Sequence, residues 1–598
     1  MNVLFCHVLF HTFLRSHIEY IKSILGVSMK LRKRLLACSL SVLLFITGCT
    51  KFTIPTNANA AFKNFTLCLF QEEVSSNTIN LHYSLQHPEK YGITDIPITL
   101  GSFDFNETAA LAAIENWDNA LHKFSYQSLS DENQLTYDIL SHYFALAKEN
   151  TLYHLYEEPL SPVTGIHAQL PVLLAEYQFL CADDVETYLL LLGTLPEYFA
   201  SLVRFEQQKS ASGLFMSDAL VDAVVEQCNA FVAMGDDNYL LSTFEERVNN
   251  VTDLTSEESA ELIRENKKVI SKCVLPAYES LAASLTSLKG TGKSAQGLCH
   301  LPDGKNYYTH LIALDTGSGR SVAELKTLIR QQIAVDLLDR QKILQENPSI
   351  LETSDFIPMP PDMVLQTLET KISKTFPKAT SVNVQVKYVP KALEAYLSPA
   401  FYLIPSIDNF MENTIYINQA YSLNDIDLFT TLAHEGYPGH LYQTTYFANT
   451  NPDPIRTLLN FSGYVEGWAT YAEMCAYYLT SLEKPYATLL QKNNSFILGL
   501  YAAADIGIHY DGWSVSDTAA FFSDYGIDDM SAIQEIYEYI VGDPANYLMY
   551  YVGYLEMLEL KKEMFSELGN DFSQKEFHKQ ILEIGPAPFE IIKKHLPM

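Results

Sequence analysis

The sequence predicts a mainly α-helical protein with one small β-sheet. Three observations support this fold class. Runs with apolar residues at helical spacing dominate the chain of 598 residues. The alternation of apolar and polar residues that is typical of strands is sparse and falls between residues 382 and 417. No stretch rich in Pro, Gly or Ser divides the chain after residue 64, so we expect one helical body over residues 65–598, although this length ordinarily suggests more than one domain.

The helical spacing and the alternation together give the expected elements. The amphipathic runs that predict helices are residues 107–123, 132–148, 184–208, 216–234, 256–287 and 321–346, together with nearly all of the chain after residue 425. Residues 382–388 alternate and are expected to form one strand. Residues 401–404 and 414–417, joined through residues 406–413, look like a β-hairpin.

The N-terminal residues have the pattern of a lipoprotein signal peptide. Four basic residues come first, namely Lys30, Arg32, Lys33 and Arg34. An apolar stretch follows over residues 35–45, which is short for a membrane span of about twenty residues. Because Ile46-Thr47-Gly48-Cys49 resembles a lipoprotein cleavage site, we expect Cys49 to become the lipidated first residue and residues 50–64 to form a tether. Met29 directly precedes this pattern, so residues 1–28 are expected to lie upstream of the translated start.

Charge and cysteine content limit the classes of partner. The formal net charge is −31, and the part from Cys49 onward is more acidic still because the first 48 residues are rich in Lys and Arg. Such a surface repels nucleic acid and anionic lipid headgroups, so we expect no nucleic-acid partner and expect the lipid to supply the membrane anchor. Six widely spaced cysteines remain after Cys49 and predict core thiols, with one or two disulfides as the alternative: Cys68, Cys181, Cys228, Cys273, Cys299 and Cys475.

One short segment contains the residue types of a zinc hydrolase. His434 and Glu435 are followed by His440, and Glu466 comes twenty-six residues after that. Two imidazoles and one carboxylate can hold Zn²⁺ and leave a fourth position open, while a second carboxylate beside the first His can accept a proton from water. We therefore expect His434, His440 and Glu466 to be the zinc ligands and Glu435 the general base. The alternative is an ordinary His-Glu pair before a helix stop.

The spacing requires a break in the helix. Common zinc hydrolases place their two His four residues apart on one helical face, whereas six residues of regular helix would rotate His440 by about 240° away from His434. Gly436, Pro438 and Gly439 provide such a break, and we interpret it as a helix with a two-residue bulge.

A second helix is expected around Glu466. Glu473 lies seven residues further on, close to the same face, and is expected to contact a ligand from outside the metal site. The Asp-Thr-Gly at residues 315–317 resembles the loop of aspartic peptidases, but that chemistry needs two such carboxylates and the sequence has no second copy.

These motifs resemble those of a family of bacterial lipoproteins of unknown function that has a His-Glu-x-x-Pro-Gly-His signature and is grouped with the gluzincin metallopeptidases. Other stretches of the chain are similar to the same family: Leu301-Pro302-Asp303-Gly304-Lys305, Asp505-Ile506-Gly507-Ile508-His509, Tyr550-Tyr551-Val552-Gly553 and Glu576-Phe577-His578. The resemblance runs from about Asn80 to the C-terminus. It implies a gluzincin-like helical fold with a small sheet beside the metal site and a cleft between two helical halves.

A fainter resemblance links the chain to thimet-type oligopeptidases and carboxypeptidase Taq. Those enzymes take the third zinc ligand from a Glu at a similar distance and have a Tyr-rich helix facing the scissile carbonyl, which residues 546–554 resemble. The resemblance implies that a phenol stabilises the oxyanion, with Tyr550 first and Tyr547 second, against the alternative of core and rim aromatics. His509 is a separate candidate for contacting substrate, with a buried structural His as the alternative.

The sequence therefore predicts zinc-dependent hydrolysis of peptide bonds by an exported enzyme, anchored by its lipid to the extracytoplasmic face of a membrane. Two alternatives stay open. One is a peptide-binding lipoprotein that keeps the fold without turnover, which would have no use for Glu435 as a base. The other is a metal hydrolase of a non-peptide amide or ester. The oligomeric state is not predicted.

Overall fold

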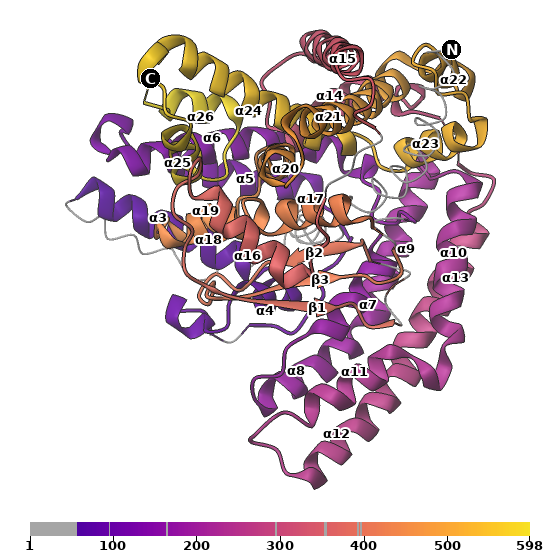
Figure 1. Ribbon diagram of the computed structural model, residues 1–598. Helices are drawn as coiled ribbons and strands as arrows, with labels where there is room; N and C mark the ends of the chain where they lie inside the picture. The colour runs from indigo at the N-terminus through magenta and orange to yellow at the C-terminus, as the bar shows by residue number, and fades with distance from the viewer. Residues whose placement is uncertain are drawn as a thin grey trace. The chain divides into compact units, whose positions relative to one another are not determined.

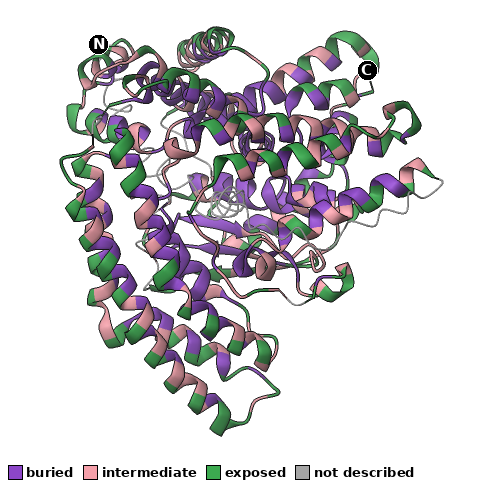
Figure 2. Cartoon of the chain, turned by 180° about the vertical axis from the view of Figure 1, so that it is seen from behind, coloured by how far each residue is buried: buried purple, intermediate pink, exposed green. Residues whose placement is uncertain are grey.

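The computed structural model describes residues 57–94, 96–162, 165–292, 296–351, 356–391, 394, 397–421 and 423–597. These residues are mainly α-helical and include one three-stranded sheet, which confirms the predicted fold class (Figure 1). The outer helices have buried residues along one side and exposed residues along the other, as their amphipathic patterns predict (Figure 2). The cleft expected between helical halves stays a prediction.

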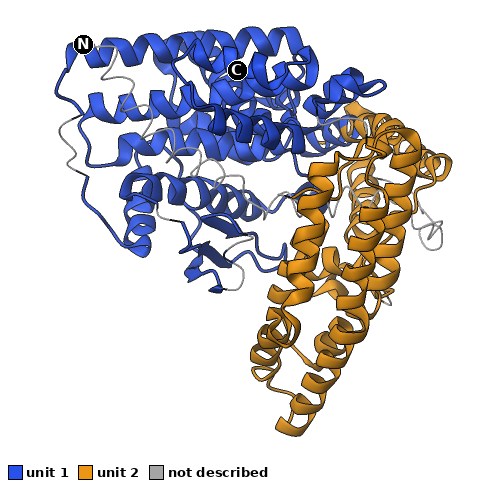
Figure 3. Cartoon of the chain, turned by 90° about the vertical axis from the view of Figure 1, so that its right-hand side faces the viewer, with its two compact units in different colours: residues 1–28, 131–142, 296–598 blue, residues 29–130, 143–295 orange. Residues whose placement is uncertain are grey.

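The described residues form two units where the sequence predicted one body (Figure 3). Unit 1 contains residues 131–142 and 296–597, and unit 2 contains residues 57–130 and 143–292. One boundary falls within the helix α6 (Asp131–Asn150), which is continuous in structure and ordinary in composition. Composition therefore could not mark where one unit ends.

The regular elements among the described residues of unit 2 are all helices, and the unit also takes in the second part of α6. Its other helices are α3 (Ala58–Val74), α4 (Thr78–Ser84), α5 (Glu107–Leu121), α7 (Ile166–Glu176), α8 (Ala182–Gly193), α9 (Leu195–Ser212), α10 (Asp218–Ala233), α11 (Tyr239–Val248), α12 (Ser256–Val269) and α13 (Leu275–Ser287). The single helix expected over residues 184–208 is wrong, because α8 ends at Gly193 and Pro196 occupies the first turn of α9, where its missing N–H costs no hydrogen bond.

The tether expected over residues 50–64 is wrong for its last part. The side chain of Asn57 accepts a hydrogen bond from the N–H of Asn59, and α3 begins at Ala58. Alanine favours helices and Asn is a good N-cap, so this short polar stretch starts a helix that buries Phe62 completely. Cys49 and the signal sequence lie outside the described residues. Each of the six cysteines after Cys49 is a free thiol.

The sheet of unit 1 has the strand order β1-β3-β2, formed by β1 (Asn383–Tyr388), β2 (Ala400–Leu403) and β3 (Glu412–Ile417). Strands β2 and β3 are antiparallel, with Phe401 opposite Tyr416, which confirms the hairpin. Strand β1 runs parallel to β3, so β2 is an edge strand. The helix α17 (Asp425–Glu435) packs against β2.

The remaining helices of unit 1 complete this part of the chain. They are α14 (Gly304–Thr316), α15 (Val322–Glu346), α16 (Pro361–Ile372), α18 (His440–Asn449), α19 (Pro454–Leu458), α20 (Ser462–Ala476), α21 (Lys484–Ile506), α22 (Val515–Ser523), α23 (Met530–Gly542), α24 (Asn546–Leu568), α25 (Gln574–Ile584) and α26 (Phe589–His595). No helix among the described residues is long and apolar enough to cross a membrane.

Helices α20 and α24 form the centre of unit 1. They cross where Gly467 faces Gly553, and a Cβ atom on Gly467 would lie 2.5 Å from the Cα atom of Gly553. Only glycine allows backbones to approach this closely. Because Glu466 and Tyr550 are close to this crossing along their respective helices, the crossing fixes the position of one relative to the other.

Candidate metal centre

The segment between the two histidines is a turn between two helices. Asn424 caps α17 by accepting hydrogen bonds from the N–H groups of Ile426 and Asp427, both at 3.0 Å, and α17 ends at Glu435. A new helix, α18, begins at His440. The expected break is therefore present, but the two-residue bulge is wrong, because the helix stops and a second one starts.

Residues at the turn leave no room for larger side chains. A Cβ atom on Gly439 would lie 1.8 Å from the carbonyl oxygen of His434, so the turn needs glycine there. The indole of Trp468 on α20 donates a hydrogen bond of 2.8 Å to the carbonyl of Pro438. Trp468 thus attaches the turn to the helix that carries Glu466.

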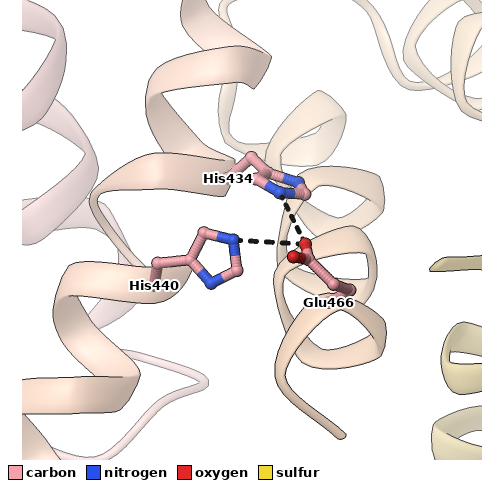
Figure 4. A group of neighbouring side chains, drawn as sticks. All are labelled: His434, His440 and Glu466. Atoms are coloured by element: carbon pink, nitrogen blue, oxygen red, sulfur yellow. Dashed lines mark ion pairs between the residues drawn. The ribbon is translucent and has the colours of Figure 1, made fainter. Parts of the chain in front are cut away.

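The three expected ligands converge from α17, α18 and α20, and their side chains point toward one another (Figure 4). The Nε2 atoms of His434 and His440 lie 3.6 and 3.4 Å from the same Oε2 atom of Glu466. The three ligand atoms all lie within 4.8 Å of one another, and all three residues are buried. This is the one group of its kind among the described residues.

These spacings suit a zinc ion. Zinc bonds to imidazole nitrogen and carboxylate oxygen are about 2.0–2.1 Å, so two ligand atoms at a tetrahedral angle lie roughly 3.3 Å apart. Two neutral imidazoles and one carboxylate are also the donor set of catalytic zinc sites, which leave a fourth position for water or substrate. The residues present therefore fit the group that the sequence predicts.

The charges of the cluster are strongly coupled. Burial by itself lowers the pKa of His434, but its hydrogen bonds to Glu466 and Glu473 outweigh burial and raise the pKa to about 10. Burial raises the pKa of Glu466, but His434 and His440 more than offset this and hold it far below its usual range. The two carboxylates thus favour the protonated form of His434 when no metal ion is bound, and a metal ion would compete with that proton.

Glu473 contacts His434 from the side away from Glu466. Its Oε2 atom lies 3.2 Å from Nδ1 of His434, and its Oε1 atom accepts a hydrogen bond of 2.7 Å from Asn494 on α21. Metal-binding histidines commonly donate their second N–H to a carboxylate in this way, which fixes the ring orientation and the tautomer. His440 lacks such a partner, because its Nδ1 atom is buried without a hydrogen bond in the described structure.

Glu435 points to the edge strand. Its Oε2 atom accepts a hydrogen bond of 2.9 Å from the N–H of Tyr402 in β2, which holds the carboxylate between strand and helix. Burial is the main effect on Glu435 and raises its pKa, although His440, His434 and the Tyr402 N–H act in the opposite direction. A raised pKa suits a residue that takes up and returns a proton.

The two candidate tyrosines have different surroundings. The ring of Tyr550 lies 6.3 Å from the ring of His434, and burial followed by the charges of Glu466 and Glu435 raises its pKa well above the usual value. Tyr550 is therefore a neutral O–H donor beside the cluster. Tyr547 packs on Tyr501 at 5.1 Å between ring centroids and is influenced by neither of these carboxylates.

His509 is a structural histidine, so the prediction that it contacts substrate is wrong. It is fully buried, its Nδ1 atom accepts a hydrogen bond of 3.1 Å from the N–H of Leu298, and its Nε2 atom lies 2.8 Å from the carbonyl oxygen of Ile540. Both ring nitrogens are used by the backbone, which leaves neither for a ligand. Burial lowers the pKa of His509 to about 4, so the ring is neutral.

The sequence did not single out three groups that hold the site in place. These are the N–H of Tyr402, the amide of Asn494 and the indole of Trp468. Trp468 follows Glu466 by two residues and could have been noticed for that reason. The other two give no local signal. Every residue except proline has a backbone N–H, and Asn494 lies in an ordinary amphipathic helix.

Comparisons with known proteins agree with the fold. The structure resembles that of "the putative lipoprotein from Colwellia psychrerythraea", with a TM-score of 0.78 and 19% identity over 90% of this chain and 98% of that one. It also resembles "a putative lipoprotein of unknown function from Shewanella oneidensis", with a TM-score of 0.59 and 18% identity over 90% and 98% of the two chains. No curated protein matches the chain.

The family comparison covers most of the sequence. Residues 104–596 match a family described as "Bacterial protein of unknown function (DUF885)". The match includes the turn with both histidines, Glu466 and the Tyr-rich helix α24. The chain belongs to this family, DUF885.

Proposed function

We propose that this protein is a zinc-dependent peptidase. The observation that carries the proposal is the convergence of His434, His440 and Glu466 on one buried point, with Glu435 next to the first ligand in the chain. A metal site that only stabilises the fold closes its fourth position and has no use for a neighbouring base. A carboxylate with a raised pKa beside a three-ligand site supports a hydrolase.

Each residue has a distinct role in the proposed reaction. His434, His440 and Glu466 would hold zinc, which when bound supplies a Lewis acid for the scissile carbonyl and for the attacking water. Glu435 accepts the proton of that water and passes it to the leaving amine. Its Oε2 atom is held by Tyr402, which leaves Oε1 to take the proton.

Tyr550 is the proposed donor to the oxyanion. Its phenol is neutral and buried beside His434, so its O–H can stabilise negative charge that develops on the carbonyl oxygen. The edge strand β2 is suited to bind a peptide in extended form, because its outer edge has no strand partner among the described residues. The substrate class that fits both features is a peptide.

The proposed place of action is outside the cytoplasm. The lipobox-like sequence ending at Cys49 and the acidic composition support an exported protein that a lipid anchors to the extracytoplasmic face of a membrane. The two similar structures are both described as lipoproteins, which supports the same location.

The test is metal analysis of the purified protein followed by digestion of a peptide library with and without a chelator. We expect about one zinc ion per chain and cleavage that the chelator abolishes. Glu435→Gln is the matched control, since it keeps the shape of the side chain but cannot accept a proton. It should retain zinc while turnover falls by a factor on the order of 10² to 10⁴.

Three results would contradict the proposal. A protein without zinc has no such centre. A zinc protein that cleaves no peptide is a binding lipoprotein or acts on another amide or ester. Near-normal turnover in Glu435→Gln removes the proposed base and leaves the fold unaffected.

A further inference from the structure

We infer that Asp505 is a positioning residue for Tyr550, because it holds the backbone at Ala545 and thereby fixes the start of the helix that carries this phenol. The inference rests on the proposed function. It concerns the motif Asp505-Ile506-Gly507-Ile508-His509, which contributes no residue to the metal centre.

Ala545 has an unusual backbone conformation directly before α24. Its φ angle is +61°, in the left-handed region that residues with a Cβ atom rarely adopt, and it is completely buried. Such a conformation persists only where the surroundings impose it. The N–H of Ala545 donates a hydrogen bond of 3.1 Å to the Oδ1 atom of Asp505.

Asp505 joins three helices of unit 1. It is fully buried near the end of α21, and its Oδ1 atom also accepts a hydrogen bond of 2.6 Å from the hydroxyl of Tyr308 on α14. A buried carboxylate is tolerated only when hydrogen bonds replace its lost hydration. The bond to Ala545 extends this junction to the first residue before α24.

His509 contacts the chain on the other side of the connection between α23 and α24. It lies in the π-helical turn Gly507–Asp511 that follows α21, stacks on Tyr308 at 5.3 Å between ring centroids, and bonds to the carbonyl of Ile540 in α23. His509 therefore contacts Ile540 before the connection between α23 and α24, and Asp505 contacts Ala545 at its end. This gives the spacing of the motif's two polar residues, Asp505 and His509, a structural purpose within this chain.

Tyr550 lies between two fixed points of α24. One is Ala545, five residues before it, and the other is the crossing at Gly553, three residues after it. The candidate metal ligands belong to α17, α18 and α20, and none of these helices contains Ala545. Releasing Ala545 should therefore displace the phenol and leave the metal in place.

The experiment is a double-mutant cycle between Asp505→Ala and Tyr550→Phe in the full chain. We expect Asp505→Ala to keep zinc and KM but to lower kcat by about tenfold to a hundredfold, since displacing a catalytic group by about 1 Å has effects of that size. In the Tyr550→Phe background, Asp505→Ala should lower kcat by less than about twofold. The phenol that Asp505 positions is already absent there. Asp505→Asn, which keeps an oxygen that accepts the Ala545 N–H, should restore most of the turnover.

Glu556→Ala is the matched control. Glu556 is another buried carboxylate of unit 1 that accepts hydrogen bonds, from Ser318 and Arg320, but it follows the crossing at Gly553. Glu556→Ala should lower kcat by the same factor in the wild-type background and in the Tyr550→Phe background. If Asp505→Ala fails to fold, Tyr308→Phe takes its place in the cycle. This substitution removes only one donor to Asp505, so we expect a smaller fall in kcat.

A second measurement does not need turnover. With 3-fluorotyrosine at position 550, Asp505→Ala should shift or broaden the fluorine resonance, whereas Asp505→Asn and Glu556→Ala should leave it unchanged. A protein that cleaves no peptide contradicts the proposed function, and the fluorine result then decides whether Asp505 positions Tyr550. Equal costs of Asp505→Ala in both backgrounds, or an unchanged resonance, would overturn the inference.

Discussion

Two buried histidines of unit 1, His434 and His509, show how partners decide what a buried imidazole does. Both are almost inaccessible to solvent, with exposed fractions of 2% and 0%. His434 faces two carboxylates, Glu466 and Glu473, whereas His509 faces the backbone groups of Leu298 and Ile540. The pKa of His434 is raised to about 10, while burial lowers that of His509 to about 4.

This difference in partners makes His434 a candidate metal ligand and His509 a structural residue. Carboxylates gather negative charge that a cation can neutralise, so the surroundings of His434 favour a proton or a metal ion. Backbone groups satisfy both ring nitrogens of His509 and favour the neutral ring. Burial is common to both residues and therefore does not distinguish them.

The largest expected effect is on metal content. His434→Ala, His440→Ala and Glu466→Ala should each lose zinc while the helical fold remains, because each removes one of three ligands. His509→Ala should keep zinc but lose stability by about 1–3 kcal/mol for each backbone group left unpaired. Metal analysis and thermal unfolding of the four variants measure both. Full zinc occupancy in His440→Ala would exclude it as a ligand.

The next effect concerns the two tyrosines. Tyr550→Phe removes one hydrogen bond made mainly in the transition state, so kcat and kcat/KM should fall together by roughly 10² to 10³ with little change in KM. Tyr547→Phe is the matched control and should be milder, because Tyr547 packs on Tyr501. Steady-state kinetics on both variants decide the order. A larger loss in Tyr547→Phe would transfer the oxyanion role to that residue.

Local features of unit 1 were predictable from the sequence because they depend on neighbours in the chain. Asn424 caps α17 as its position before an apolar run suggests, and the hairpin of β2 and β3 follows from alternation. The closeness of His434, His440 and Glu466 could be predicted because few residue types bind zinc, and the sequence has them at a suitable spacing. The break between His434 and His440 followed from Gly436, Pro438 and Gly439.

Contacts between distant segments were not predictable in the same way. His509 is 211 residues from Leu298, and only the folded chain shows that this backbone group occupies its ring. The N–H of Tyr402 reaches Glu435 across 33 residues for a similar reason. The two-unit organisation was hidden because the chain passes between units inside a regular helix, α6.

A smaller effect on zinc affinity is expected from Glu473, which contacts His434. Glu473→Gln keeps the size of the side chain but removes the charge that orients His434, so zinc affinity should fall by about 10-fold to 100-fold. Competition with a metal-binding dye measures this directly. Glu556→Gln changes a buried carboxylate away from the histidines and serves as the control. Equal affinities in the two variants would mean that Glu473 only fills space behind His434.

The smallest effect is on stability at acidic pH. It tests whether a buried histidine with no carboxylate partner among the described residues stays neutral. Burial lowers the pKa of His578 to about 3, while its ring bonds to the hydroxyl of Tyr471 and the carbonyl of Thr375. The unfolded chain takes up a proton on this ring below pH 6.5, and the folded chain does so only near pH 3. Stability from a neutral His578 is therefore present above pH 6.5 and is lost as the pH falls toward 3.

This loss has a size that urea unfolding can measure. Between pH 6 and 5, His578 should reduce the free energy of unfolding by about 1.2 kcal/mol, and His578→Gln should remove that part of the slope. Metal-free His434 contributes little in this window, because its raised pKa keeps the ring protonated when folded and its ordinary pKa keeps it mostly protonated when unfolded. Equal slopes in the wild type and His578→Gln would show that His578 is charged in the folded protein and that partners alone do not separate the two kinds of histidine.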